Sequence, residues 1–194
     1  FYLRDLPYRS FNPRHVLEWK LFRDFTMGTS GLLGVHMFDI VQFVMDMPFP
    51  ASAVSMGGVF VYKDGREIED TFDALIEFPN EIIMHYTTHL GNDTTPPLSV
   101  LGTNGTLNLE AATYSGQGGV PGKDLLPKED QKLEVQRGNR HDHMLNFLEC
   151  MRTRQKPIAD IEVAYQSAVI SLMAQEAMYA GRRLKYDPVK EAII

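Results

Sequence analysis

Residues 71–78, TFDALIEF, alternate between apolar and polar positions and decide the fold class of this sequence. The alternation predicts a half-buried antiparallel strand, because successive side chains of a strand point to opposite faces. The face predicted to be buried carries Phe72, Ala74, Ile76 and Phe78, and the other carries Thr71, Asp73 and Glu77. The Pro79-Asn80 pair predicts a turn, so residues 81–90 are expected to return as the second strand of a hairpin.

Further strands are expected on both sides of this hairpin. Stretches rich in apolar and β-branched residues predict strands at residues 53–62, 98–102, 106–110 and 132–136. Gly and Pro residues predict a loop over residues 113–128. Residues 1–25 combine Pro7 and Pro13 with aromatic residues, and they are expected to be mostly irregular.

Three helices are expected, one before the strands and two after them. They cover residues 32–45, residues 140–154, and a segment that begins with Asp160 as its N-cap and ends at Gly181. The apolar face predicted for the first helix carries Leu33, Met37, Ile40, Val41 and Val44, and that of the last carries Ile161, Ala164, Tyr165, Ala168, Val169 and Leu172. This order predicts an α+β fold with a mostly antiparallel open sheet and helices packed on one face. The other face would suit a second subunit if residues such as Leu75 and Ile83 make it apolar.

Length, composition and charge exclude several classes of protein. A chain of 194 residues with 44% hydrophobic and 23% charged residues predicts one globular domain over residues 1–194. No apolar run approaches the roughly 20 residues that span a bilayer, and a net charge of -6 disfavours nucleic acid, so neither partner is expected. Cys150 is the single cysteine, which excludes an internal disulfide and a thiolate zinc site. A single cysteine is compatible with a cytoplasmic location, which we expect, and with export to the periplasm.

A histidine near the start of the first helix is the best candidate for chemistry. In GLLGVHMFD, residues 31–39, glycines open the helix, and His36 precedes Asp39 by three positions. An imidazole at such a helix start can exchange a proton with a substrate hydroxyl near pH 7, or it can be a core residue bonded to Asp39 or to a carbonyl. The pair His85 and His89 spans about 13 Å along a strand, too far to share one metal ion, so no metal is expected.

Three stretches resemble the C-terminal domain of the glucose-fructose oxidoreductase / inositol dehydrogenase / MocA family of NAD(P)-dependent oxidoreductases. The first is WKLFRDFTMGTSGLLGVHMFD, residues 19–39, which is similar to the family's G-x-H-x-x-D segment. The second combines Gly57-Gly58, Asp70-Thr71 and the GTNGT turn of residues 102–106. The third pairs HMLNFLECMRTRQKP with GRRLKYDP near the end of the chain. Their order and spacing extend the resemblance over nearly the whole chain.

The resemblance implies a function that needs a second domain. In this family an N-terminal Rossmann domain binds NAD or NADP, and this sequence has no G-x-G-x-x-G fingerprint of its own. We therefore expect residues 1–194 to be a substrate-binding and oligomerisation domain that lacks its Rossmann domain and is inactive alone. The substrate is expected to be a sugar, a polyol or a related hydroxyl compound, and the protein a homodimer or tetramer formed through the open sheet face.

The resemblance also assigns roles to particular residues. His36 corresponds to the histidine that contacts the reacting hydroxyl, and Lys20 and Asp39 are further candidates for substrate contact. Leu32 stands where many members have an acidic residue that orients or relays the proton. This departure favours an alternative, a non-catalytic sugar-binding or scaffold module derived from such an enzyme.

Overall fold

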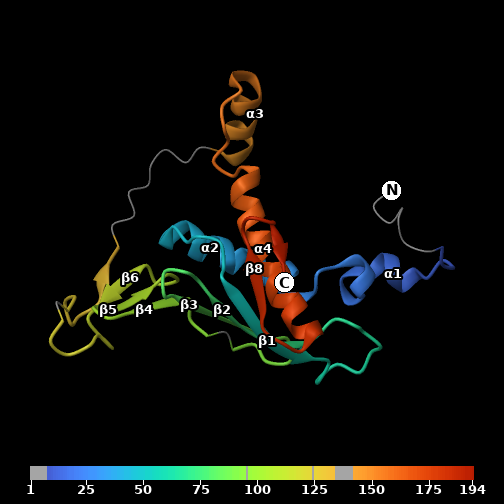
Figure 1. Ribbon diagram of the computed structural model, residues 1–194, viewed down its shortest axis with the longest axis horizontal. Helices are drawn as coiled ribbons and strands as arrows, with labels where there is room; N and C mark the ends of the chain where they lie inside the picture. Colours follow the sequence, from blue (N-terminus) through green and yellow to red (C-terminus); the bar gives the residue numbers. More distant parts are fainter. Residues whose placement is uncertain (1–7, 95, 124, 134–141) are drawn as a thin grey trace. The chain divides into compact units, whose positions relative to one another are not determined.

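The computed structural model describes residues 8–94, 96–123, 125–133 and 142–194 (Figure 1). Close contacts divide the chain into two compact units. Unit 1 comprises Phe1–Asp93 and Ala159–Ile194, and unit 2 comprises Thr94–Ile158. The expectation of one domain over residues 1–194 stays a prediction, and each unit is described by itself.

Unit 1 contains a five-stranded sheet in the order β3-β2-β1-β8-β9. Its strands are β1 (Ser52–Gly58), β2 (Thr71–Glu77), β3 (Ile83–His89), β8 (Leu184–Asp187) and β9 (Ala192–Ile193). Every neighbouring pair is antiparallel, and Ala74 in β2 pairs with both Ser55 and Tyr86. The hairpin predicted from the alternating stretch is therefore confirmed as β2 and β3.

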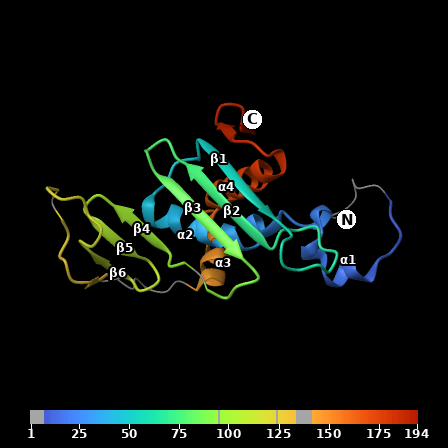
Figure 2. The same ribbon diagram turned by 90° about the horizontal axis from the view of Figure 1, so that it is seen from below.

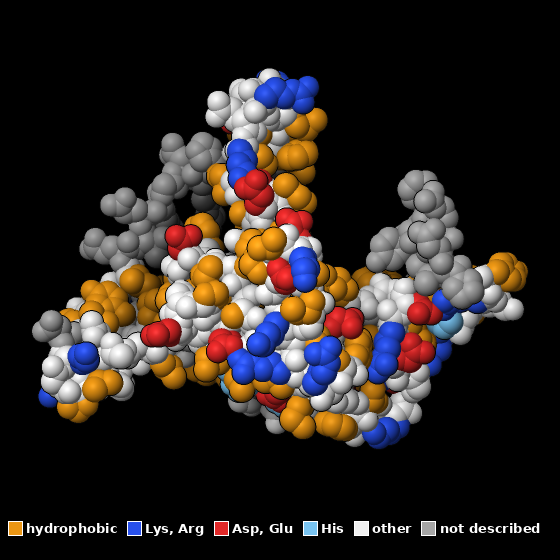
Figure 3. Space-filling view, viewed as in Figure 1, with side chains coloured by type: hydrophobic (Ala, Val, Ile, Leu, Met, Phe, Trp, Pro, Cys, Tyr) orange, Lys and Arg blue, Asp and Glu red, His pale blue; other side chains and the backbone are white. Residues whose placement is uncertain are grey.

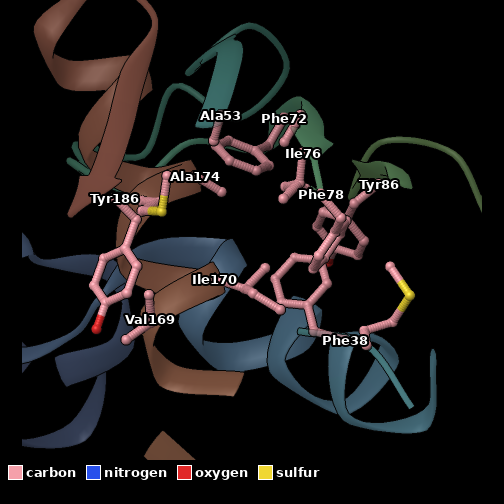
Figure 4. Packing of buried hydrophobic residues seen from close by; sticks show 13 residues of the cluster. Phe38, Ala53, Phe72, Ile76, Phe78, Tyr86, Val169, Ile170, Ala174 and Tyr186 are labelled. Carbon is pink, nitrogen blue, oxygen red and sulfur yellow. The ribbon is translucent and has the colours of Figure 1, made fainter. Parts of the chain in front are cut away.

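Two helices, α2 (Val35–Met45) and α4 (Ile161–Ala180), cover one face of this sheet (Figure 2). The core lies between the two layers, where Phe38 of α2 and Ile170 of α4 meet the side chains that β2 points inward (Figure 4). Phe72, Ala74, Ile76 and Phe78 are all at most 1% exposed, as the alternation predicted. The α+β fold with helices on one face of an antiparallel sheet is confirmed.

The buried face of α2 is not the face that its apolar residues predicted. Phe38 and Gln42 are buried, together with Gly34 just before the helix, whereas Leu33 and Met37 are exposed. Ile40 and Val44 complete the exposed apolar side. The helix buries the other side because Gly34 lets the backbone approach β3: a Cβ there would lie 3.2 Å from the Tyr86 ring.

The buried face of α4 also differs from the predicted one. Ile161 is 80% exposed, and Tyr165 and Leu172 are partly exposed, while Ser167, Ser171 and Gln175 are buried. These polar side chains are tolerated because each makes a hydrogen bond inside the unit. The helix ends were predicted correctly. Asp160 accepts from the N–H groups of residues 162 and 163, and Gly181 follows in the left-handed conformation.

Short helices replace the irregular lead-in that was expected for residues 1–25. Within its described part they are α1 (Pro13–Leu17) and the 3-10 turns Trp19–Leu21 and Arg23–Phe25. The Leu21 carbonyl accepts from the N–H groups of Glu67 and Ile68, so this segment is held to the loop between β1 and β2.

Unit 2 contains a four-stranded antiparallel sheet and one helix. The strands are β4 (Ser99–Gly102), β5 (Gly105–Asn108), β6 (Thr113–Ser115) and β7 (Gln131–Lys132), and the helix is α3 (His143–Thr153). Strand β6 corrects the prediction of a loop over residues 113–128, because Thr113 and Ser115 pair with β5. Residues 134–136 and 140–141 of the predicted strand and helix lie outside the described residues.

The outer surface is mixed in charge. On the face seen in Figure 3, Lys and Arg side chains lie among Asp and Glu side chains and do not merge into one basic area. Within the described part of the chain, no helix combines the length and the apolar character that crossing a membrane requires.

Candidate functional site

His36 is the second residue of α2, and its side chain is exposed. The alternative of a core histidine is therefore wrong. The preceding residues, Ser30–Gly34, form a π-helix, which the Val35 N–H closes by donating to the Ser30 carbonyl. π-helical turns are rare in proteins, and those that occur are often found at functional sites. The sequence predicted an ordinary helix here, so the local geometry that presents His36 is a finding of the structure.

Asp39 is exposed on the same helix and contacts α4 rather than His36. Its Oδ1 lies 3.4 Å from Ser167 Oγ, and that hydroxyl also lies 2.8 Å from Gln42 Oε1. No hydrogen bond joins Asp39 to His36, although both residues are described. Asp39 thus helps to tie α2 to α4.

Lys20 lies on the 3-10 turn Trp19–Leu21, and it is exposed. Among the described residues no hydrogen bond or ion pair joins it to His36 or Asp39. Its neighbour Leu21 accepts at its carbonyl from two N–H groups of the β1–β2 loop. The structure brings His36 and Asp39 onto one helix and leaves Lys20 on a separate segment.

A buried carboxylate next to the start of this helix was missed by the sequence analysis. Glu69 is 2% exposed and accepts from the Thr29 N–H at 2.8 Å, the Thr29 hydroxyl at 2.7 Å and the Gln175 side-chain amide at 3.2 Å. Burial raises the pKa of Tyr179, and the nearby charge of Glu69 raises it further. The only signal in the sequence was an acidic residue directly before the Asp70-Thr71 strand start.

A cavity of about 240 Å³ lies beside Glu69 in unit 1. Arg23 and Tyr179 line it, with the Arg23 guanidinium 4.3 Å from the centre of the Tyr179 ring. Neither His36, Lys20 nor Asp39 is among its lining residues. The cavity is therefore separate from the site that the sequence predicted.

The two strand histidines share a carboxylate that the sequence analysis did not connect with them. Asp73 in β2 lies 3.4 Å from His85 Nε2 and 3.7 Å from His89 Nε2 on the open face of the sheet. The diagonal position of Asp73 on the neighbouring strand brings it between the two rings. Even so, no group of three ligating side chains suited to a metal ion occurs among the residues that the structure describes.

The described residues do not provide a dinucleotide site. Dinucleotides bind where a parallel β-α-β unit places a glycine-rich turn at a helix N-terminus. Both sheets of this chain are antiparallel in every described pair. The described residues therefore do not form the parallel β-α-β unit on which dinucleotides bind in that way.

Comparison with solved structures shows what this fold resembles. The chain is similar to an NAD-binding protein from Listeria innocua, with 19% identity, a TM-score of 0.64, and coverage of 86% of this chain and 54% of that one. It is also similar to the WlbA dehydrogenase from Bordetella pertussis in complex with NADH and UDP-GlcNAcA, with 16% identity, a TM-score of 0.62, and coverage of 88% and 49%. A third similar structure is aldose-aldose oxidoreductase from Caulobacter crescentus complexed with glycerol, with 19% identity, a TM-score of 0.63, and coverage of 86% and 50%.

These likenesses concern the fold, and the chain spans about half the length of the solved structures it matches. Comparison with the curated proteins gives no match. The model of the oxidoreductase family C-terminal alpha/beta domain, however, matches residues 5–186, nearly the whole chain. The chain therefore belongs to the glucose-fructose oxidoreductase / inositol dehydrogenase / MocA family and corresponds to its C-terminal α/β domain.

Proposed function

We propose that this chain is the substrate-binding and oligomerisation domain of an NAD(P)-dependent oxidoreductase that acts on a sugar, a polyol or a related hydroxyl compound. One observation carries the proposal: an exposed imidazole, His36, is presented by the first turn of α2 directly after a π-helix. The family membership supports the reaction class. Two structural neighbours, named as a dehydrogenase with UDP-GlcNAcA and an oxidoreductase with glycerol, support the substrate class.

His36 would act as the general base. Oxidation of an alcohol requires loss of the hydroxyl proton as hydride leaves the carbon, and a base within hydrogen-bond reach accepts that proton. Imidazole suits this task because its ordinary pKa lies close to neutral pH. Asp39 would accept a hydrogen bond from a second substrate hydroxyl, and the Lys20 ammonium would donate one to a substrate oxygen.

The nicotinamide cofactor supplies the hydride acceptor when it is bound, and we assign its binding to a Rossmann domain outside this chain. The exposed apolar side of α2 supports this arrangement. Leu33, Met37, Ile40 and Val44 lie along it and are 37–44% exposed. The first turn of the same helix carries His36, so a domain that covered this surface would lie close to the imidazole.

Leu32 favours a second candidate function. It lies in the π-helix four positions before His36, where many family members have an acidic residue. A leucine cannot accept or relay a proton. The alternative is therefore a non-catalytic sugar-binding or scaffold module that keeps ligand binding and has lost the chemistry.

The test compares His36→Asn with the unaltered full-length protein in assays with NAD or NADP and a panel of sugars and polyols. Loss of a general base should lower kcat by about 10²- to 10⁴-fold. The matched control is His143→Asn, since His143 is exposed at the start of α3 in unit 2. Equal activity of His36→Asn and the unaltered protein would refute the assigned base. Binding of a polyol in calorimetry without any turnover would support the non-catalytic alternative.

Self-association through the open sheet face has its own test. Val54, Met56, Leu75 and Ile83 on that face are 39–77% exposed. A charge at the centre of a self-associating face would disrupt it because two copies would meet there. We expect Leu75→Asp to reduce the molar mass measured by light scattering, while Leu101→Asp, at an exposed position of β4 in unit 2, should not change it. An unchanged mass for Leu75→Asp would exclude this face as the interface.

A further inference from the structure

The start of the His36 helix is held by a buried carboxylate, Glu69, whose hydrogen-bond donors are neutral groups of Thr29 and Gln175. The Glu69 carboxylate receives three hydrogen bonds, two from Thr29 and one from Gln175. A buried carboxylate is unfavourable unless it is well hydrogen-bonded. Its position between these donors is therefore strongly determined, and the donors are held with it.

These bonds join three segments that are distant in the sequence. Thr29 precedes the π-helix, Glu69 lies in the loop between β1 and β2, and Gln175 lies in α4. The neighbouring residues add two restraints. Ser30 donates from its hydroxyl to the Ser171 carbonyl of α4, and a Cβ at Gly28 would lie only 2.4 Å from the Gln175 amide oxygen. The turn before the π-helix consequently has little freedom to move.

The π-helix gives this anchor a consequence for His36. A π turn contains about one residue more than an α turn, and each residue of an α-helix rotates the chain by about 100°. If the π turn at Ser30–Gly34 relaxed into an α turn, residues on one side of it would rotate by about this angle relative to those on the other. Phe38 and Gln42 are buried and hold the far side, whereas Thr29 holds the near side. In the sequence His36 lies between these two anchors, in the first turn of α2 just after the π turn.

We propose that Glu69 is a positioning residue for His36: by holding Thr29 against α4, its carboxylate maintains the π-helical turn that directs the imidazole outward. The catalytic importance of this role rests on the proposed function, but the positional effect does not. Glu69 touches no reacting atom in this scheme. It acts through Thr29 and the wide turn alone.

The experiment follows by NMR the imidazole signals of the six histidines of this chain, within the full-length protein, across a pH titration and without substrate. In Glu69→Gln, the charge is lost and the new side-chain NH₂ group takes the place of the oxygen that accepts from Gln175, so the Gln175 amide must turn to keep a bond there. The paired variant, Glu69→Gln with Gln175→Glu, again places a donor, the NH₂ group at position 69, opposite an acceptor, the carboxylate at position 175. Thr29→Val removes only the hydroxyl bond and serves if the Glu69 variant fails to fold. Ser55→Ala is the matched control, because it deletes a buried hydrogen bond, to the Ala174 carbonyl, in which neither Thr29 nor Glu69 takes part.

We expect Glu69→Gln and Thr29→Val to shift the His36 signal and its titration curve, while His143 in unit 2 is unaffected. The paired variant should return the His36 signal toward its original position. Ser55→Ala should lower the melting temperature but should leave the His36 signal where it is. Where turnover is measurable, a misplaced base should lower kcat by up to about 10²-fold in Glu69→Gln, with recovery in the paired variant. An unchanged His36 signal in folded Glu69→Gln and Thr29→Val, or a shift equal to that of Ser55→Ala, would overturn the proposal. Absence of dehydrogenase activity would instead count against the proposed function, because the NMR measurement needs no turnover.

Discussion

Replacement of Asp70 by Asn should destabilise unit 1 through the loop that leads into β2. Asp70 is fully buried, and its two oxygens accept from the N–H groups of Phe60, Val61 and Tyr62 at 2.8–3.0 Å and from the Thr71 hydroxyl at 3.2 Å. Asparagine keeps one acceptor oxygen and turns an NH₂ group toward the remaining donors. One buried N–H would then lose its partner, at about 1–3 kcal/mol, and the bonds that remain would lose their charge. We expect a total loss of about 2–4 kcal/mol at pH 7.

The pH dependence of this loss gives a second check. Burial alone would raise the pKa of Asp70, but the three backbone hydrogen bonds outweigh it and hold the pKa below the ordinary value of 3.8. A carboxyl group with a lowered pKa stabilises the fold above its unfolded pKa, and this contribution is lost as the pH falls through the folded pKa. The difference between Asp70→Asn and the unaltered protein should therefore be full at pH 7 and should shrink below about pH 4.

The assay is urea unfolding followed by the fluorescence of Trp19, which is the single tryptophan and lies in unit 1. The control is Asp24→Asn, which removes an exposed ion pair with Arg9 and should cost at most about 1 kcal/mol. A loss below about 0.5 kcal/mol for Asp70→Asn, the range of ordinary surface substitutions, would refute the reasoning.

Three further substitutions have outcomes that the structure determines. Gly28→Ala should lower the melting temperature more than Gly122→Ala, because both glycines have positive φ but only Gly28 lies against a side chain, that of Gln175; equal effects would contradict the close approach. Phe38→Ala should cost about 3–5 kcal/mol in urea unfolding, since the ring is fully buried, and a cost below 1 kcal/mol would be inconsistent with this packing. Burial raises the pKa of Tyr186 to about 12, so an alkaline absorbance titration should show a phenol step near pH 12 that Tyr186→Phe removes. Because the ordinary pKa of tyrosine is 10.0, the contribution of neutral Tyr186 to the stability of the fold is present below pH 10 and is lost toward pH 12. Titration of every tyrosine near pH 10 would contradict the burial of Tyr186.

The sequence predicted the sheet better than the helix faces, and the reason is physical. In β2 each inward residue is apolar, so the alternation and the burial coincide. On α4 the buried row includes Ser167, Ser171 and Gln175, and on α2 it includes Gln42. Their hydrogen bonds compensate the burial of polar groups, and no hydrophobic period can reveal such bonds. The apolar residues that the pattern selected lie partly on the exposed sides.

The candidate site was only partly predictable for a related reason. His36 could be identified because it lies within a local motif and a resemblance to a family. Glu69 could not, because its partners lie 40 residues before it and 106 residues after it in the chain. Asp73 likewise meets His85 and His89 only through the pairing of β2 with β3. Local patterns report local structure, whereas these contacts depend on the tertiary fold.

The absence of any buried residue in α3 has a consequence for the local unfolding of this helix. All residues of α3 are described and none is buried, whereas the middle of α4 is packed against α2 and against the sheet of unit 1. Local opening costs little where few apolar contacts are broken. In the isolated chain the amide protons of α3 should therefore exchange with deuterium through small local fluctuations, while those around Ile170 in α4 should exchange only when unit 1 unfolds as a whole. Protection that appears in α3 on addition of the proposed Rossmann domain would then show which residues of α3 that domain covers.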